Sequence, residues 1–407
     1  MKKKSASQSA YFNLRLLTGL FLALAGVFQF GNPGAAFSEN YTVEGGACEW
    51  SAGPDMPSVG VRSVGVYFPP NGKFYAMGGA SSDSAGSDFT HPFEYDPATN
   101  AWTTKMATYP DNQVNNMACG VLVANNMSYI YCVGGSAATQ TTATARVFRY
   151  NPFTDMIETL DAQDNWPGDS SGTILPGGFA LAANSPIAGD LSLYILGGFD
   201  INVASINQIW MFNQYGPIGS KWHQMVNTPM GVMYAPTCTI GNHIYVAGSS
   251  DFQGGTVVDT TNSFSFDSFT NTIGTIAPIP RATGETRALT FNGQMLVMGG
   301  GRVAPNPSNE VDIYDPVSNT WTTGSPVPAF TTARRNFPTD TDGTTRIWLA
   351  GGYDNTGVPV ASMEIFCQGG GTPTPTPTAT ATATATATVT PRFTPSPRPR
   401  PTPVPRP

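Results

Sequence analysis

Six short apolar runs recur along the chain, and each ends at a glycine. They cover residues 74–77, 129–132, 193–196, 244–247, 295–298 and 347–350. Each run is apolar almost without a break, which is typical of a strand buried on both faces. A Gly-Gly doublet follows each run, degenerate as Gly248-Ser249 in the fourth, and successive doublets lie 51 to 63 residues apart. This spacing predicts six units of one repeat.

A tight-turn signal precedes each run. The signals are Asn71-Gly72, Asn125-Asn126, Gly189-Asp190, Gly241-Asn242, Asn292-Gly293 and Asp342-Gly343. Type I′ hairpin turns need positive φ, which Asn, Asp and Gly adopt most readily. We therefore expect each unit to open with a two-stranded hairpin.

A second hairpin is predicted after each doublet. An aromatic or large apolar residue ends a third strand, a turn rich in Asp, Asn and Pro follows, and a second large apolar residue comes seven positions later. The pairs are Tyr95 and Trp102, Tyr150 and Ile157, Phe266 and Ile273, Tyr314 and Trp321, and, with three extra residues, Phe212 and Trp222. Each unit thus has four strands.

Glycine doublets followed by an aromatic residue and Trp at this spacing resemble the kelch motif, from Trp50 to Phe366. The resemblance implies an all-β fold, a six-bladed kelch-type β-propeller with four-stranded sheets around a central channel. The last unit ends at Phe366 without a fourth strand, whereas Trp50 precedes the first hairpin and lacks a third strand before it. We expect the N-terminal strand to close the last blade, which removes an open sheet edge.

Two disulfides follow from this strand map. A two-residue turn at Asn125-Asn126 places Cys119 opposite Cys132, and closure of the last blade places Cys48 and Cys367 on either side of one hairpin turn. Such bridges require an oxidising compartment. Cys238 is left over, and we interpret it as a buried thiol, with a reactive or intermolecular role as the alternative.

The two ends of the chain differ from the repeats. Residues 1–36 have the layout of a secretory signal peptide, with three lysines, an apolar run and small residues. The alternative is an uncleaved anchor, although the 15-residue run at 16–30 falls short of the roughly 20 that span a bilayer. Residues 37–47 lead into the propeller at 48–368. Residues 369–407, rich in Thr, Pro and Ala, predict a disordered tail or extended spacer.

These ends predict a secreted, extracellular or cell-surface protein that is not inserted in a membrane after cleavage. O-glycosylation of the tail and cell-wall association through it are hypotheses. Residues 40–371 contain 12 Lys or Arg and 26 Asp or Glu, a net charge of −14. Because this charge repels phosphate backbones, we expect no nucleic-acid partner.

Few residues suggest catalysis. Copper radical oxidases occur among kelch-like propellers, but His91, His223 and His243 fall on separate parts of the strand map. Asp340 and Asp342 fall in a predicted hairpin turn, where they serve the backbone rather than calcium. The sequence holds no Gly-x-Ser-x-Gly, phosphate loop or Cys-x-x-Cys. No metal site or cofactor is expected.

Loops before the inner strands and after the doublets meet around the channel mouth. The predicted binding rim contains Arg62, Asn116, Tyr234, Arg281, Arg287, Arg302, Arg334 and Arg335, with Glu285 beside them. Arginine forks onto carboxylates and sugar hydroxyls. The alternative is that these arginines close the blades through ion pairs with Asp or Glu.

The hypothesis that follows is a non-enzymatic module that binds an extracellular protein or a glycan through this rim. The second hypothesis is a sugar-modifying enzyme similar to the sialic-acid mutarotases, which are also six-bladed kelch propellers, with Glu285 as acid–base and Arg281 or Arg287 holding a carboxylate. A purely structural spacer is a third. Anomerisation of free sialic acid, lost in Glu285→Gln, would distinguish the enzyme.

Overall fold

A computed structural model describes residues 49–83, 88–137, 139, 141–202, 204–253 and 255–367. The predicted signal peptide, the lead-in at 37–47, Cys48 and the predicted tail lie outside the described residues. The predictions made for them therefore stay predictions.

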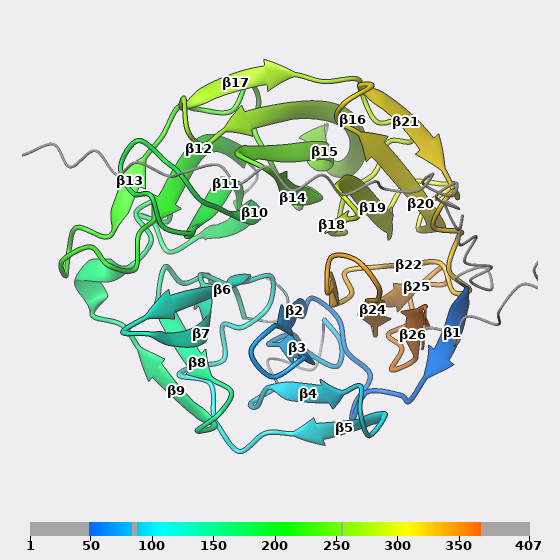
Figure 1. The fold of residues 1–407 in the computed structure, drawn as a ribbon, viewed down its shortest axis with the longest axis horizontal. Coiled ribbons are helices and arrows are strands. Elements are labelled where there is room, and N and C mark those ends of the chain that lie inside the picture. The colour runs from blue at the N-terminus through cyan, green and yellow to red at the C-terminus, as the bar shows by residue number, and fades with distance from the viewer. Residues whose placement is uncertain are drawn as a thin grey trace, which may run out of the picture. The chain divides into compact units, whose positions relative to one another are not determined.

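Six four-stranded antiparallel sheets are arranged in a ring around a central axis, as Figure 1 shows in a view along that axis. We number these blades one to six in chain order. The innermost strands contact one another in sequence around the ring, and the last of them returns to the first. They are β2 (Val64–Phe68), β6 (Ala118–Ala124), β10 (Ile174–Ala182), β14 (Thr237–Ile240), β18 (Ala288–Phe291) and β23 (Thr339–Thr341). The six-bladed propeller is confirmed.

The other strands of each blade follow outward in chain order. The second strands are β3 (Lys73–Met77), β7 (Met127–Val133), β11 (Ser192–Asp200), β15 (His243–Gln253), β19 (Gln294–Gly300) and β24 (Ile347–Ala350). The third strands are β4 (Phe93–Asp96), β8 (Val147–Asn151), β12 (Ala204–Phe212), β16 (Thr256–Asp267), β20 (Ser308–Asp315) and β26 (Met363–Phe366). The outer strands are β5 (Ala101–Thr104), β9 (Met156–Thr159), β13 (Trp222–Gln224), β17 (Thr272–Thr275), β21 (Thr320–Thr323) and β1 (Trp50–Gly53).

The sixth blade is closed by the N-terminal strand, as predicted. In Figure 1 the blue β1 lies beside the orange β26, and Trp50 pairs with Phe366 in their antiparallel register. The indole N–H of Trp50 donates to the Pro328 carbonyl at 2.7 Å, and its ring lies 5.7 Å from Phe330. The two ends of the described chain are thus joined in one sheet.

The predicted outer pairs are all found in register. They are Tyr95 with Trp102, Tyr150 with Ile157, Phe212 with Trp222, Phe266 with Ile273 and Tyr314 with Trp321. Each outer Trp also donates its indole N–H to a carbonyl of the segment that leaves the preceding blade: Trp102 to Pro54, Trp222 to Asp164 and Trp321 to Ala277. These bonds fasten blades one, three and five to the blade before each of them.

Every predicted inner hairpin forms, but the predicted turn type holds in only two of them. Asn125-Asn126 and Asn292-Gly293 have positive φ at both turn residues. In blade four only Gly241 does, and the other three turns are longer than two residues. In those three longer turns the length of the loop, rather than the Gly or Asn signal, determines the type of turn.

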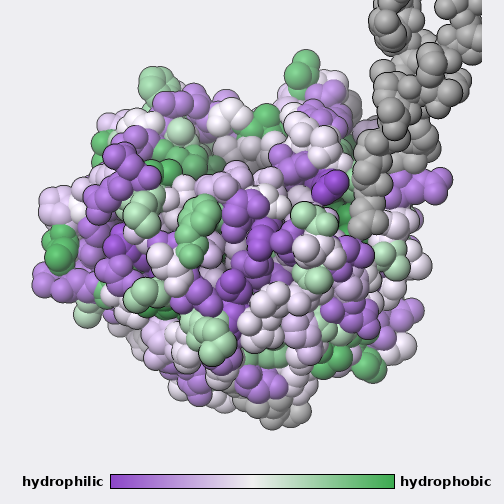
Figure 2. Space-filling view, turned by 60° about the horizontal axis from the view of Figure 1, so that its bottom comes forward, coloured by the Kyte–Doolittle hydropathy of each residue, from purple (hydrophilic) through white to green (hydrophobic). Residues whose placement is uncertain are grey.

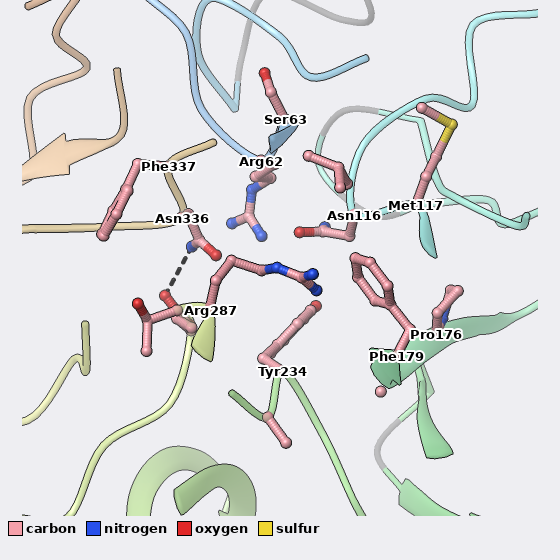
Figure 3. Close-up of a pocket in the computed structure, with 15 residues that line it drawn as sticks. Arg62, Ser63, Asn116, Met117, Pro176, Phe179, Tyr234, Arg287, Asn336 and Phe337 are labelled. Carbon is pink, nitrogen blue, oxygen red and sulfur yellow. Dashed lines mark hydrogen bonds between the residues drawn. The ribbon is translucent and has the colours of Figure 1, made fainter. Parts of the chain in front are cut away.

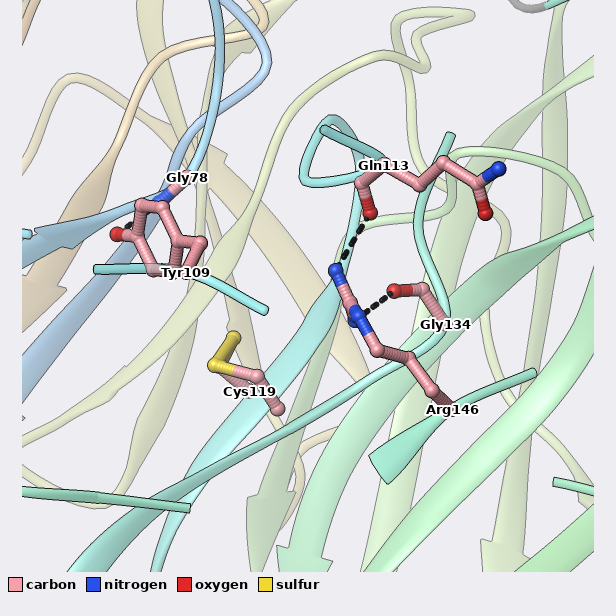
Figure 4. Close-up of a disulfide and its surroundings, with 7 residues drawn as sticks. Gly78, Tyr109, Gln113, Cys119, Gly134 and Arg146 are labelled. Atoms are coloured by element: carbon pink, nitrogen blue, oxygen red, sulfur yellow. Dashed lines mark hydrogen bonds between the residues drawn. A yellow bond between two sulfur atoms is a disulfide. The ribbon is translucent and has the colours of Figure 1, made fainter. Parts of the chain in front are cut away.

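Cys119 and Cys132 face each other on β6 and β7 and form the predicted disulfide (Figure 4). Cys238 is a buried free thiol, and burial raises its pKa to about 12. The backbone N–H of Cys367 donates to the Glu49 carbonyl at 3.2 Å, next to the position of its predicted partner, Cys48. That second bridge stays a prediction.

The glycine doublets draw two loops of each blade together. Gly79 has a φ of +93°, and a Cβ there would lie 2.6 Å from the carbonyl oxygen of Val61, in the segment that enters β2. Val61 and Ala80 exchange backbone hydrogen bonds at 2.9 and 3.1 Å. Only glycine allows this approach. Segments before the inner strands and after the doublets therefore share one face around the channel mouth.

Candidate functional site

The outer surface offers no broad recognition patch on the side shown in Figure 2, where apolar side chains lie scattered among polar ones. Single exposed residues such as Val317 and Met106 need no functional explanation. The channel mouth is different, because several chemically distinct side chains converge there.

A ring of strained backbone forms this mouth. The residue shortly before the inner strand has positive φ in five blades, at Arg62, Asn116, Tyr234, Glu285 and Asn336. Backbone hydrogen bonds between these residues link neighbouring blades. The N–H of Asn336 donates to the Glu285 carbonyl at 2.7 Å, and the N–H of Arg62 donates to the Asn336 carbonyl at 2.8 Å. The N–H of Asn116 donates to the Arg62 carbonyl and the N–H of Glu285 to the Tyr234 carbonyl, both at 3.0 Å. Non-glycine residues in this conformation cost roughly 1–3 kcal/mol each and cluster at functional sites.

These five residues line one cavity of about 60 Å³ at the mouth. Of the predicted rim, Arg62, Asn116, Tyr234 and Arg287 line it together with Glu285, whereas Arg281, Arg302, Arg334 and Arg335 do not. Figure 3 shows the Arg287 guanidinium near its centre, between Asn116, Tyr234 and Phe179.

Sequence reasoning missed Asn336 and Phe179. Asn336 follows Glu285 by 51 residues, as Glu285 follows Tyr234, so counting one repeat onward finds it. Phe179 lies inside β10, a continuous strand with no turn residue to mark it. Nothing in the repeat pattern distinguishes this phenylalanine from a core residue.

Arg287 is the exceptional charge of the site. Its guanidinium carbon lies 3.6 Å from the centroid of the Phe179 ring, and its Nε is buried without a hydrogen-bond partner. No carboxylate oxygen among the described residues lies within 4.0 Å of its nitrogens. Burial lowers the pKa of Arg287 to about 10, against the raising effect of the Asp340 charge further off. The side chain is therefore a cation at neutral pH that lacks a direct counter-ion within the described structure.

Glu285 is, in contrast, fully engaged. It is 2% exposed, and its carboxylate accepts from Arg335 and, at 2.8 Å, from Asn336, while Arg302 Nη2 lies 3.0 Å from Oε1. Two cations and an amide thus bind this carboxylate.

The charge of Arg62 is also balanced by an ion pair. Its Nε donates to Asp83 at 2.8 Å, and its guanidinium lies 5.9 Å from the Tyr353 ring, which Arg335 approaches at 4.5 Å. This side of the mouth, formed by blades five, six and one, is a network of paired charges.

Arg281 and Arg334 close their blades through ion pairs, which is the alternative role that the sequence left open for the rim arginines. Arg281 pairs with Asp312 at 2.8 Å, and the fully buried Arg334 pairs with Glu364 at 2.8 Å. Both also donate to the carbonyl of the first doublet glycine in their blade, Gly299 or Gly351. Arg146, which the sequence analysis did not single out, does the same for Gly134 in blade two (Figure 4). These arginines hold the doublet loops in place.

The histidines and aspartates considered for metals lie apart. His91 contacts the Ala107 carbonyl in blade one, His223 lies on β13 and His243 begins β15. Within the described ranges, no group of three or more His, Cys, Asp or Glu is placed to hold a metal ion. Nor does the described part contain a helix long and apolar enough to cross a membrane.

Asp340 and Asp342 serve different parts of the backbone. Asp342 accepts the N–H groups of Thr344, Thr345 and Arg346 within its turn. Asp340 accepts the Tyr67 N–H of blade one at 2.6 Å, and burial raises its pKa to about 6. One aspartate orders a turn, and the other joins the sixth blade to the first.

Comparison with known proteins agrees with the repeat. Residues 283–328 match the family model of the Kelch motif. Kelch-like protein 25 of Xenopus tropicalis is 24% identical over 202 residues, which are 49% of this chain and 31% of that protein. Kelch-like protein terF of Aspergillus terreus is 23% identical over 244 residues, 58% of this chain and 49% of that protein. The chain spans at most about half the length of these relatives.

A solved structure described as the structure of YjhT matches with a TM-score of 0.56. It is 15% identical and covers 76% of this chain and 96% of that one. At this identity the likeness concerns the fold alone.

Proposed function

The chain is a kelch-repeat β-propeller, and we propose that it acts as a binding module whose ligand enters the channel mouth and places a carboxylate on Arg287. The ligand belongs to an extracellular protein or a glycan. We further propose that the protein is secreted or displayed at a cell surface. The Cys119–Cys132 disulfide supports this location, since such bridges persist in oxidising compartments.

The observation that carries the proposal is the cation without a direct counter-ion. Other rim arginines are paired with Asp83, Asp312, Glu364 or Glu285, so their charges are already balanced. Burying a charge without a partner is costly, whereas a bidentate carboxylate on a guanidinium forms strong, short hydrogen bonds. A ligand carboxylate would therefore gain most at Arg287.

Asn116 adds a second donor to this position. Its Nδ2 is buried and has no hydrogen-bond partner among the residues that the structure describes, and Figure 3 shows its side chain pointing to the centre of the cavity. The cavity has room for a carboxylate and the carbon that bears it.

The alternative, a sugar-modifying enzyme with Glu285 as acid–base, has less support. A general acid–base must reach the proton it transfers, but both oxygens of the Glu285 carboxylate are already bound by Arg335, Arg302 and Asn336. Arg281, one of the two candidates for gripping a substrate carboxylate, is paired with Asp312. Binding without turnover is therefore favoured.

Arrays of acidic and neutral glycans and of peptides with free or amidated C-termini test the proposal on the full chain. We expect retention only of carboxylate-bearing ligands and at least a tenfold loss in Arg287→Gln. Arg346→Gln, in the turn between β23 and β24, is the matched control and should retain binding. Retention that survives Arg287→Gln, or anomerisation of free sialic acid that is lost in Glu285→Gln, would refute the binding module.

A further inference from the structure

The channel mouth has two chemically different sides. Blades five, six and one present the paired charges of Glu285, Arg335, Arg302, Arg62 and Asp83. On the opposite side, blades two to four contribute an apolar cluster that reaches the cavity through Tyr234: Ala143, Leu175, Phe199, Met233 and Tyr234, with Ile201, Phe252 and Val257 packed on it. We call this cluster the apolar wall.

Long hairpins raise the apolar wall above the mouth. β15 and β16 continue past Gly248 for five more residue pairs, from Ser249 with Thr260 to Gln253 with Thr256. In blade three, β11 and β12 continue past Gly198 to Asp200 and Ala204. Met233, which precedes the inner strand of blade four, forms a bridge with Ser250, so these extensions are on the face of the cavity.

Aromatic contacts connect the wall to the carboxylate position. The ring of Phe199 lies 5.7 Å from Tyr234 and, stacked, 6.3 Å from Phe252. Tyr234 lines the cavity beside Arg287 (Figure 3). Ile201, Phe252 and Val257 are half-buried, so part of the surface of each side chain is exposed.

A ligand carboxylate on Arg287 therefore has an apolar neighbour on one side and a polar neighbour on the other. A peptide C-terminus carries both groups next to its carboxylate, because its last side chain can be apolar while the backbone amide is polar. A sugar acid lacks the apolar group, and a fatty acid lacks the polar one. We infer that the ligand is the free C-terminus of a peptide whose last residue is large and apolar. This inference rests on the proposed function and specifies the ligand of the same site.

Five probes test this inference by calorimetric titration of the full chain. Three are peptides: Gly-Gly-Gly-Phe, Gly-Gly-Gly-Ala and amidated Gly-Gly-Gly-Phe. The other two, hexanoate and glucuronate, are other sources of a carboxylate. We expect the Phe peptide to bind at least about tenfold more tightly than the Ala peptide, since burying a phenyl ring in place of a methyl group is worth more than one factor of ten. Amidation should abolish binding, and both simple acids should bind more weakly than the Phe peptide.

Phe252→Ala identifies the wall as the source of this preference. The variant should bind the two free peptides with affinities that differ by a ratio below about three. Phe269→Ala, which removes a phenyl ring that is 57% exposed in the turn between β16 and β17, should retain the full ratio. If the hairpin variant folds poorly, Ile201→Ser provides the same comparison.

The outcomes separate the two proposals. Equal affinity for the Phe and Ala peptides, tighter binding of hexanoate or glucuronate, or a ratio unchanged in Phe252→Ala would overturn the inference while carboxylate binding through Arg287 stands. If no carboxylate probe binds, or if Arg287→Gln binds them all as the native chain does, the proposed function itself fails.

Discussion

Trp50→Ala is expected to open the propeller at the sixth blade. The substitution removes the 2.7 Å indole bond to Pro328, worth about 1 kcal/mol. It also removes aromatic contacts with Phe330 and Phe366 at 5.7 and 5.4 Å, worth about 1 kcal/mol each. The free energy of unfolding should therefore fall by about 3 kcal/mol, measured by urea denaturation.

Trp102→Ala is the matched control. Trp102 has the same place in blade one, donates to Pro54 at 3.0 Å and packs on Tyr95 and Phe74 at 5.4 and 6.0 Å. Its strand, however, is joined to β4 by a short turn, whereas β1 and β26 come from opposite ends of the propeller and pair without such a turn. Amide exchange of β26 should accelerate in Trp50→Ala, while β4 stays protected in Trp102→Ala. Equal exchange of the two third strands would refute closure by β1.

Two further perturbations follow from the described structure. Reduction of the Cys119–Cys132 disulfide, which spans a separation of 13 residues, should lower the free energy of unfolding by about 3 kcal/mol more in the native chain than in the Cys119→Ala, Cys132→Ala variant. An equal response of both to the reductant would contradict this prediction. Burial raises the pKa of Asp340 to about 6, above its value near 4 in the unfolded chain, so the folded state disfavours the charged carboxylate. The free energy of unfolding should therefore rise by up to about 3 kcal/mol as the pH falls from above 6 to 4. Denaturation at several pH values should show this slope flattened in Asp340→Asn, and an unaltered slope would assign it to another group.

The repeat architecture could be read from the sequence because it depends on counting. Seven residues between Tyr95 and Trp102 fix a four-stranded register, and the same count carried across the chain ends places Trp50 opposite Phe366. Cys119 and Cys132 follow from the same arithmetic. Such pairings need only strand alternation and turn length.

The site was only partly predictable, because its charges depend on partners far away in the sequence. Arg281 and Arg287 look alike in the chain, yet Asp312 on β20 neutralises the first, and no described carboxylate pairs with the second. The apolar wall depends on the length of two hairpins and on the stacking of Phe199 with Phe252, which come from different blades. Neither property is visible in the spacing of the repeats.

The most direct test of the account observes Arg287 itself. The Nε–Hε signals of the arginines can be followed by NMR while propionate is added to the full chain, with Arg287→Lys to assign the signal. A carboxylate bound at the channel mouth should shift the Arg287 signal and leave those of the paired Arg281 and Arg334 unchanged. A titration in which the Arg287 signal stays still, or moves only as much as that of Arg281, would contradict the claim that this guanidinium receives the ligand.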